Sequence, residues 1–143
     1  MLSMIDIAIN IPITILAAAA SFALGMLWWS PVLFGRQWIA AMKAAGKDPE
    51  QLKKDTHMGA SFGLSALGWL VASCMLAVML QTVGAMGVVE SLKLAGLLWL
   101  GFTIAFDVNS LAFEKRPLAI FLINNGYYLV GLLIMAAIMG VWA

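Results

Sequence analysis

The sequence predicts an all-α integral membrane protein with four transmembrane helices and a short amphipathic interfacial helix between the first and second. Three observations support this prediction. Hydrophobic residues make up 64% of the 143 residues, and only 10% are charged, whereas a soluble domain carries about 25% charged residues. The apolar residues also fall into four runs, each near the roughly 20 residues that cross a bilayer as a helix. Residues 1–143 therefore form a single membrane domain, with the lipid bilayer as its first partner.

The first span is predicted at residues 7–30. Pro12 suits its first turn, where the missing N–H of proline costs nothing. Pro31 ends the helix, because the residue before a proline is pushed out of the helical conformation. No Lys or Arg precedes Arg36, so the segment lacks the basic start of a removable signal peptide. We therefore expect it to remain as a transmembrane helix.

Residues 31–56 are predicted to form the interfacial segment with its amphipathic helix. The Ser30-Pro31 pair can begin this helix, with the serine as cap. Apolar side chains then recur at helical spacing, at Phe34, Trp38 and Met42. Such a stripe with basic flanks suits a helix in the headgroup plane, and a helix packed under the bundle would show the same pattern.

Spans two to four are predicted at residues 57–81, 88–113 and 117–142. Gly46 is expected to end the interfacial helix. The Asp48-Pro49 pair then has the cap and the first-turn proline that begin a helix. Span two is therefore expected to extend back to about Pro49 as one long helix.

The distribution of Lys and Arg predicts the orientation. With four spans, the loops after spans one and three lie on the same side of the membrane. The opposite side carries only Lys93. The first side carries the other seven basic residues: Arg36, Lys43, Lys47, Lys53, Lys54, Lys115 and Arg116. The positive-inside rule then predicts a multi-pass protein of the inner (cytoplasmic) membrane, with residues 31–56 cytoplasmic and both termini outside.

One carboxylate, Asp107, lies inside a predicted span. At the centre of a transmembrane helix it costs about 2.5–3.5 kcal/mol on insertion scales, so it has to face protein or water. Asn124 lies at nearly the same depth on the next span, counted at about 1.5 Å per residue from the turn between them. We expect the two side chains to hydrogen-bond, in a polar cluster that includes Ser61, Ser65 and Tyr127. The cluster can be structural, with Asp107 protonated, or it can be a proton or solute site.

A second stripe of small and polar residues follows span three at Gly101, Ala105 and Asn109. By helical spacing it points away from Asp107, and Asn125 points away from the face of Asn124. Two such faces are more than one compact bundle needs, and small residues allow close helix contacts. The sequence therefore predicts a homo-oligomer that uses this stripe.

The sequence lacks the residue patterns of known catalytic and metal sites. His57 is the one histidine and Cys74 the one cysteine, so one chain cannot form a His/Cys metal cluster. The Gly59-x-x-x-Gly63 spacing is typical of helix packing. We therefore expect no enzyme, no metal and no cofactor. The net charge of +1 gives no reason to expect nucleic acid as a partner.

Two segments carry motifs. The first is Gly25-x-x-Trp28-Trp29-Ser30-Pro31-x-x-Phe34-Gly35-x-x-Trp38, and the second joins Phe113-Glu114-x-Arg116-Pro117 to Ile123-Asn124-x-Gly126-Tyr127. Both resemble signatures of a family of small bacterial and fungal membrane proteins catalogued as a domain of unknown function (family 1761). The resemblance implies a four-span fold and no established activity. It nominates six residues for testing: Trp28, Ser30, Phe34, Gly35, Asn124 and Tyr127. Trp29 and Tyr128 stand where we expect Tyr and His, which puts histidine-based chemistry there in doubt.

Two functions remain open. The first is a small oligomeric transporter or channel with a polar site around Asp107 and Asn124. The alternative is a non-catalytic scaffold or accessory subunit that binds another membrane protein or lipid. A water-accessible cavity that reaches Asp107 would favour the first, and a closed bundle with an exposed groove would favour the second. The solute or protein partner cannot be named from the sequence.

Overall fold

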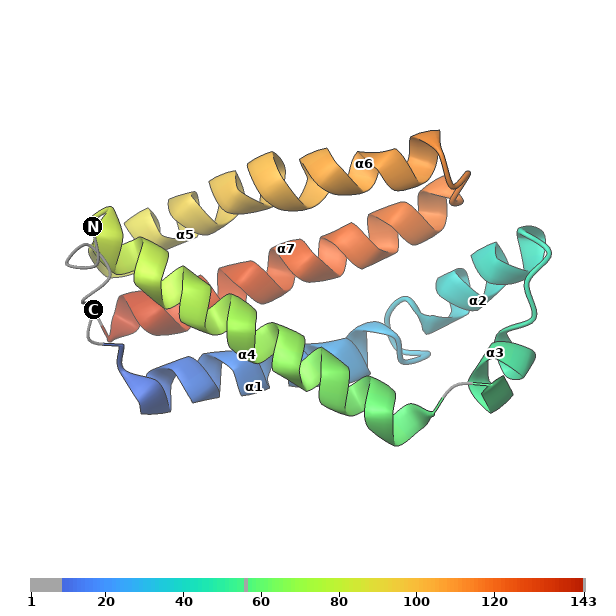
Figure 1. The fold of residues 1–143 in the computed structure, drawn as a ribbon, viewed down its shortest axis with the longest axis horizontal. Coiled ribbons are helices and arrows are strands. Elements are labelled where there is room, and N and C mark those ends of the chain that lie inside the picture. The colour runs from blue at the N-terminus through green and yellow to red at the C-terminus, as the bar shows by residue number, and fades with distance from the viewer. Residues whose placement is uncertain (1–8, 56, 143) are drawn as a thin grey trace.

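The computed structural model describes residues 9–55 and 57–142, and within these ranges every regular element is a helix. Four helical segments are long and apolar enough to cross a membrane. They are α1 (Ile11–Trp28), α4 (Met58–Thr82), the segment Gly87–Ala112 and α7 (Leu118–Val141). The predicted all-α membrane fold with four spans is confirmed (Figure 1).

Helix α7 is the centre of the bundle. It packs against α1 and against α5 (Gly87–Leu98), whereas α4 packs mainly on α1 and crosses it obliquely (Figure 1). The contact with α5 depends on a glycine, because a Cβ added at Gly140 would lie 2.7 Å from the Cα of Val88. Helix α7 therefore has protein on more than one side.

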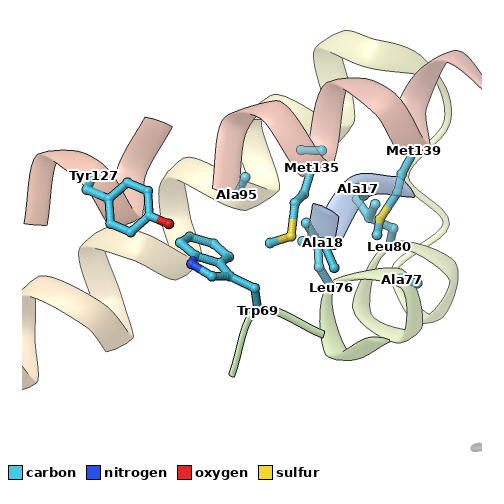
Figure 2. Close-up of a cluster of buried hydrophobic side chains, with 11 residues drawn as sticks. Ala17, Ala18, Trp69, Leu76, Ala77, Leu80, Ala95, Tyr127, Met135 and Met139 are labelled. Carbon is cyan, nitrogen blue, oxygen red and sulfur yellow. The ribbon is translucent and has the colours of Figure 1, made fainter. Parts of the chain in front are cut away.

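The buried core joins all four spans through small and flexible side chains. Ala17 of α1, Ala95 of α5 and Met135 of α7 are fully buried, and Leu76 of α4 lies in the same cluster (Figure 2). Alanine lets neighbouring helix backbones approach closely. Methionine fills the irregular space that remains between them.

Two serine hydroxyls tie the helices together across this core. The Ser21 hydroxyl donates to the carbonyl of Gly131, and the Ser73 hydroxyl donates to the carbonyl of Thr14, both at 2.8 Å. Each serine is fully buried. A buried hydroxyl needs such a partner where no water is present, so these bonds stabilise the contacts of α1 with α7 and with α4.

The interfacial segment holds two short helices, α2 (Gly35–Ala44) and α3 (Pro49–Asp55), rather than one. The prediction that the Ser30-Pro31 pair begins the first of them is wrong. The Ser30 hydroxyl donates back to the carbonyl of Leu27, and the Ser30 carbonyl accepts the N–H of Gly35. Ser30 therefore closes α1 and the following turn, and α2 begins four residues later than expected.

The predicted break between α2 and α3 is confirmed, but the long second span is not. Gly46 ends α2 in the left-handed conformation, with φ of +78°, which glycine adopts without strain. The Asp48 carboxylate accepts the N–H of Glu50 and begins α3. However, α3 ends at Asp55 and His57 is extended. The second span therefore begins at Met58 as a separate helix.

The third span contains a π-helix in its middle, η2 (Trp99–Ile104), between α5 and α6 (Ala105–Ala112). Residues eight apart on an α-helix of about 3.6 residues per turn are roughly 80° apart around the axis. The i→i+5 bonding of a π turn takes up about one extra residue. Trp99 and Asp107 therefore come to within roughly 20° of each other and face the same helix, α7.

Candidate functional site

The polar network around Asp107 connects the third span to α7 and to the turn between them. The Asn125 amide donates to the Asp107 carboxylate at 2.6 Å and to the carbonyl of Phe121 at 2.9 Å. The Arg116 guanidinium lies 3.3 Å from the same carboxylate. The indole N–H of Trp99 donates to the carbonyl of Asn125 at 2.9 Å. The burial cost of Asp107 is therefore offset by one cation and one amide.

The predicted partner of Asp107 was wrong by one residue. Asn125, which we expected to point away, binds Asp107, and Asn124 instead lines a cavity on the other side of α7. The face assignment assumed that α7 has a single inward face. Because α7 lies at the centre of the bundle, both asparagines face protein, and the π segment turns Asp107 toward Asn125.

The two serines of the predicted polar cluster are not buried beside Asp107. Ser61 and Ser65 lie on the exposed first half of α4. Ser65 borders two cavities together with Trp69 and Tyr128. The predicted cluster therefore divides into the Asp107 network and a separate site that includes Asn124, Ser65 and Tyr127.

The first sequence motif builds the junction between α1, α2 and α7. The Trp28 indole N–H donates to the carbonyl of Ile123 at 3.0 Å, and the Phe34 ring lies 4.6 Å from the Trp28 ring, centre to centre. A Cβ at Gly35 would overlap the carbonyl oxygen of Trp29 and lie 2.8 Å from that of Ser30. Only glycine fits at residue 35, so α2 can pack tightly against the end of α1.

Tyr127 is the centre of an aromatic cluster at this junction. Its hydroxyl donates to the carbonyl of Ser21 at 2.8 Å. The rings of Trp29 and Trp69 lie 4.8 Å and 5.2 Å from its ring and meet it edge to face, a favourable arrangement for aromatic pairs. Figure 2 shows the Tyr127 hydroxyl beside the Trp69 ring. A Cβ at Gly25 would lie 2.7 Å from this hydroxyl, which explains the glycine.

Three adjoining cavities of about 820, 520 and 300 Å³ open beside this cluster. Tyr128 lines all three, Trp29 lines the first two, and Trp69 lines the last two. We call the combined space the aromatic cleft. It runs between α1, α4 and α7 and continues under α2 and α3. Asp107 does not line any of these three cavities.

The end of the aromatic cleft under α2 and α3 carries charged side chains among apolar ones. Lys43 of α2 and Lys53 and Glu50 of α3 line it, together with Trp38 and Asn124. Further along, Phe22, Met26 and Phe62 line the walls beside Ser65. The cleft thus has apolar walls along its length and charged side chains at one end, as a site for an amphipathic ligand would.

The stripe predicted for oligomer contacts is exposed in the single chain. Gly101, Ala105 and Asn109 all lie on the outer surface of the third span, and a Cβ at Gly101 would meet open space. The Asn109 amide donates to the carbonyl of Phe106 in its own helix. The homo-oligomer stays a prediction, which cross-linking of a cysteine at residue 109 in membranes can test.

The sequence reasoning missed Arg116, Asn125 and Trp69 as site residues. Arg116 could have been found, because a buried carboxylate needs a cation and Arg116 follows Asp107 by nine residues across a turn. No spacing signal singles out Trp69. Its place in the cleft follows from the crossing of α4 and α1.

Residues 13–140 match a family model described as "Protein of unknown function (DUF1761)". This is the family that the two sequence motifs resemble, so that prediction is confirmed. No curated protein and no solved structure matches the chain.

Proposed function

This chain belongs to the DUF1761 family, whose description assigns no activity, and we propose that it is a non-catalytic membrane protein. The proposed ligand is hydrophobic and binds in the aromatic cleft. The observation that carries the proposal is the set of three adjoining cavities that share Tyr128. Ligand sites are typically concave, about 300–1,000 Å³ in volume and lined by aromatic side chains with a few polar groups.

The route of entry also supports ligand binding. Every residue of α4 from Met58 to Gly68 is exposed in the chain alone, so this half of the helix leaves the cleft open at its side. A molecule dissolved in the bilayer can then enter without crossing water. Entry from the lipid phase suits an apolar ligand better than an ion.

Filling the cleft should weaken binding. Ser65→Trp places an indole on the wall shared by two cavities, at an exposed position where it does not disturb the core. We expect the purified variant to retain several-fold less phosphatidylcholine than wild type after extraction from nanodiscs, as counted by native mass spectrometry.

Ser61→Trp is the matched control, because Ser61 is one turn away on the same helix, equally exposed, and outside these cavities. It should retain lipid as wild type does. Equal retention by the two tryptophan variants would contradict the proposed site.

A small transporter or channel is the second candidate, and one observation favours it. The side-chain oxygen of Asn125 is buried without a hydrogen-bond partner among the described residues, while its amide holds Asp107. A buried acceptor without a donor carries a cost of about 1–3 kcal/mol, which a water molecule or a cation would remove. A flux of protons or cations into liposomes that carry the protein would favour this candidate over ligand binding, provided that the Asp107→Asn variant loses the flux.

The orientation in the inner membrane is part of the proposal. The seven-to-one bias of basic residues supports a cytoplasmic location for α2 and α3. The start of α1 and the end of α7 lie at the opposite end of the bundle (Figure 1). A cysteine at Gly46 should resist a membrane-impermeant thiol reagent in intact cells and react after lysis. Labelling of intact cells at residue 46, with protection at Gly84, would reverse the orientation.

A further inference from the structure

The binding of an apolar ligand does not require the charged side chains at one end of the aromatic cleft. Lys43 and Lys53 come from two different helices and both line the cavity of about 820 Å³, together with Asn124 and Tyr128 of α7. Glu50 is the one acidic side chain in the same lining. The cations therefore outnumber the carboxylate at the place where α2 and α3 cover the cleft.

The apolar part of the cleft is long enough to reach the middle of a bilayer. The walls on α4 extend from Met58 through Ser65 to Ala72, which is 14 residue steps or about 21 Å at roughly 1.5 Å per step. Helix α4 crosses α1 obliquely (Figure 1), so the depth is less than this length. Half of the hydrocarbon core is about 15 Å. An acyl chain that starts at the lysines would end near the middle of the membrane.

Resting on the proposed function, we infer that the ligand is an anionic phospholipid, with its phosphate headgroup between Lys43 and Lys53 and an acyl chain along Trp29, Ser65 and Trp69. The charge of the mouth matches the headgroup, and the aromatic walls match the chain. Trp38 and Asn124 line the same cavity as the two lysines, and an indole and an amide can donate hydrogen bonds to phosphate or ester oxygens. A transmembrane helix of a partner would leave the two lysines without a matching charge.

The test measures which lipid the protein retains separately from how much lipid it retains in total. The full-length protein is placed in nanodiscs of equal parts phosphatidylglycerol and phosphatidylcholine, and retained lipids are identified by native mass spectrometry. Wild type should retain phosphatidylglycerol in preference. Lys43→Gln and Lys53→Gln should each reduce this preference by about fivefold, as expected for one basic residue at a membrane surface, and total retained lipid should stay unchanged.

Two controls separate this inference from general surface charge. Lys47→Gln and Lys54→Gln remove the same charge from the same interfacial segment, but these lysines do not line the cleft, so they should keep the wild-type preference. Glu50→Gln should increase the preference, because it removes the one carboxylate from the lining.

The outcomes distinguish the inference from the proposed function. If the Lys43 and Lys53 variants keep the wild-type preference, or if the Lys47 and Lys54 variants lose as much, the headgroup site is wrong while the cleft stands. If Ser65→Trp retains as much of both lipids as wild type, the cleft itself is wrong. Retention of a protein or a second copy of the chain in place of lipid would also overturn the inference.

Discussion

Asp107→Ala is expected to lower the free energy of unfolding by about 1–3 kcal/mol. The substitution removes the acceptor of the 2.6 Å bond from Asn125, which is itself 1% exposed, and the carboxylate 3.3 Å from Arg116. The Asn125 amide then keeps only its bond to the Phe121 carbonyl, and the Arg116 guanidinium keeps only Glu114. The side chains of Asp107 and Arg116 are 27% and 29% exposed, so the cost stays below the roughly 3–5 kcal/mol of a fully buried pair. SDS titration of the protein in mixed micelles measures it.

Glu114→Ala is the matched control for this experiment. Glu114 pairs with the same arginine at 3.2 Å, but its side chain is 67% exposed, and exposed ion pairs contribute about 0–1 kcal/mol. Asp107→Asn separates the two bonds of Asp107, because asparagine can still accept from Asn125 but no longer neutralises Arg116. Equal losses for Asp107→Ala and Glu114→Ala would show that the network does not stabilise the fold.

Gly35→Ala is expected to destabilise the protein by a similar amount, about 1–3 kcal/mol for overpacking. The added Cβ meets the carbonyl oxygens of Trp29 and Ser30. These are backbone atoms in a turn, held by the bond from the Gly35 N–H to the Ser30 carbonyl, so they cannot move aside as a side chain could. We also expect α2 to detach from the end of α1, which would widen the mouth of the aromatic cleft. The same SDS titration gives the stability, and proteolysis between α2 and α3 reports the detachment.

Gly59→Ala provides the comparison. A Cβ at residue 59 would meet nothing within 4 Å, and alanine favours a helix over glycine by about 1 kcal/mol. Gly59→Ala should therefore be neutral or slightly stabilising. A Gly35→Ala variant as stable as Gly59→Ala would mean that the carbonyls of Trp29 and Ser30 can move aside, contrary to this prediction.

The fold could be predicted from the sequence because the bilayer imposes a simple rule on it. Long apolar runs have to become helices when the solvent offers the backbone no hydrogen bonds. Prolines and glycines such as Pro31 and Gly46 then separate the helices. The break before Met58 was missed, since the Asp48-Pro49 start gave no sign that α3 would end after one or two turns.

The candidate site could be predicted only in part. Asp107 was found because an intramembrane carboxylate needs a partner. Its partner depends on how neighbouring helices rotate, and here the π turn at Trp99–Ile104 changes the rotation. The aromatic cleft was not predicted as a cavity, although the sequence motifs name residues that line it, such as Trp38, Asn124 and Tyr127. It exists because α4 lies on α1 and leaves the side of α7 near Tyr128 uncovered, and a crossing angle cannot be read from one helix.

The exposed half of α4 has a consequence for the order in which the molecule loses structure. Between Met58 and Gly68 this helix has three glycines and no buried side chain, and the Phe62 ring packs edge to face on Phe22 of α1, so helix propensity and packing hold it only weakly. What mainly holds it is the absence of water, because a backbone amide that opens in hydrocarbon finds no other partner. Its second half is anchored by Trp69, Ser73 and Leu76 in the core. Local unfolding therefore starts at the Met58 end, and the thickness and hydration of the surrounding membrane set how often it occurs.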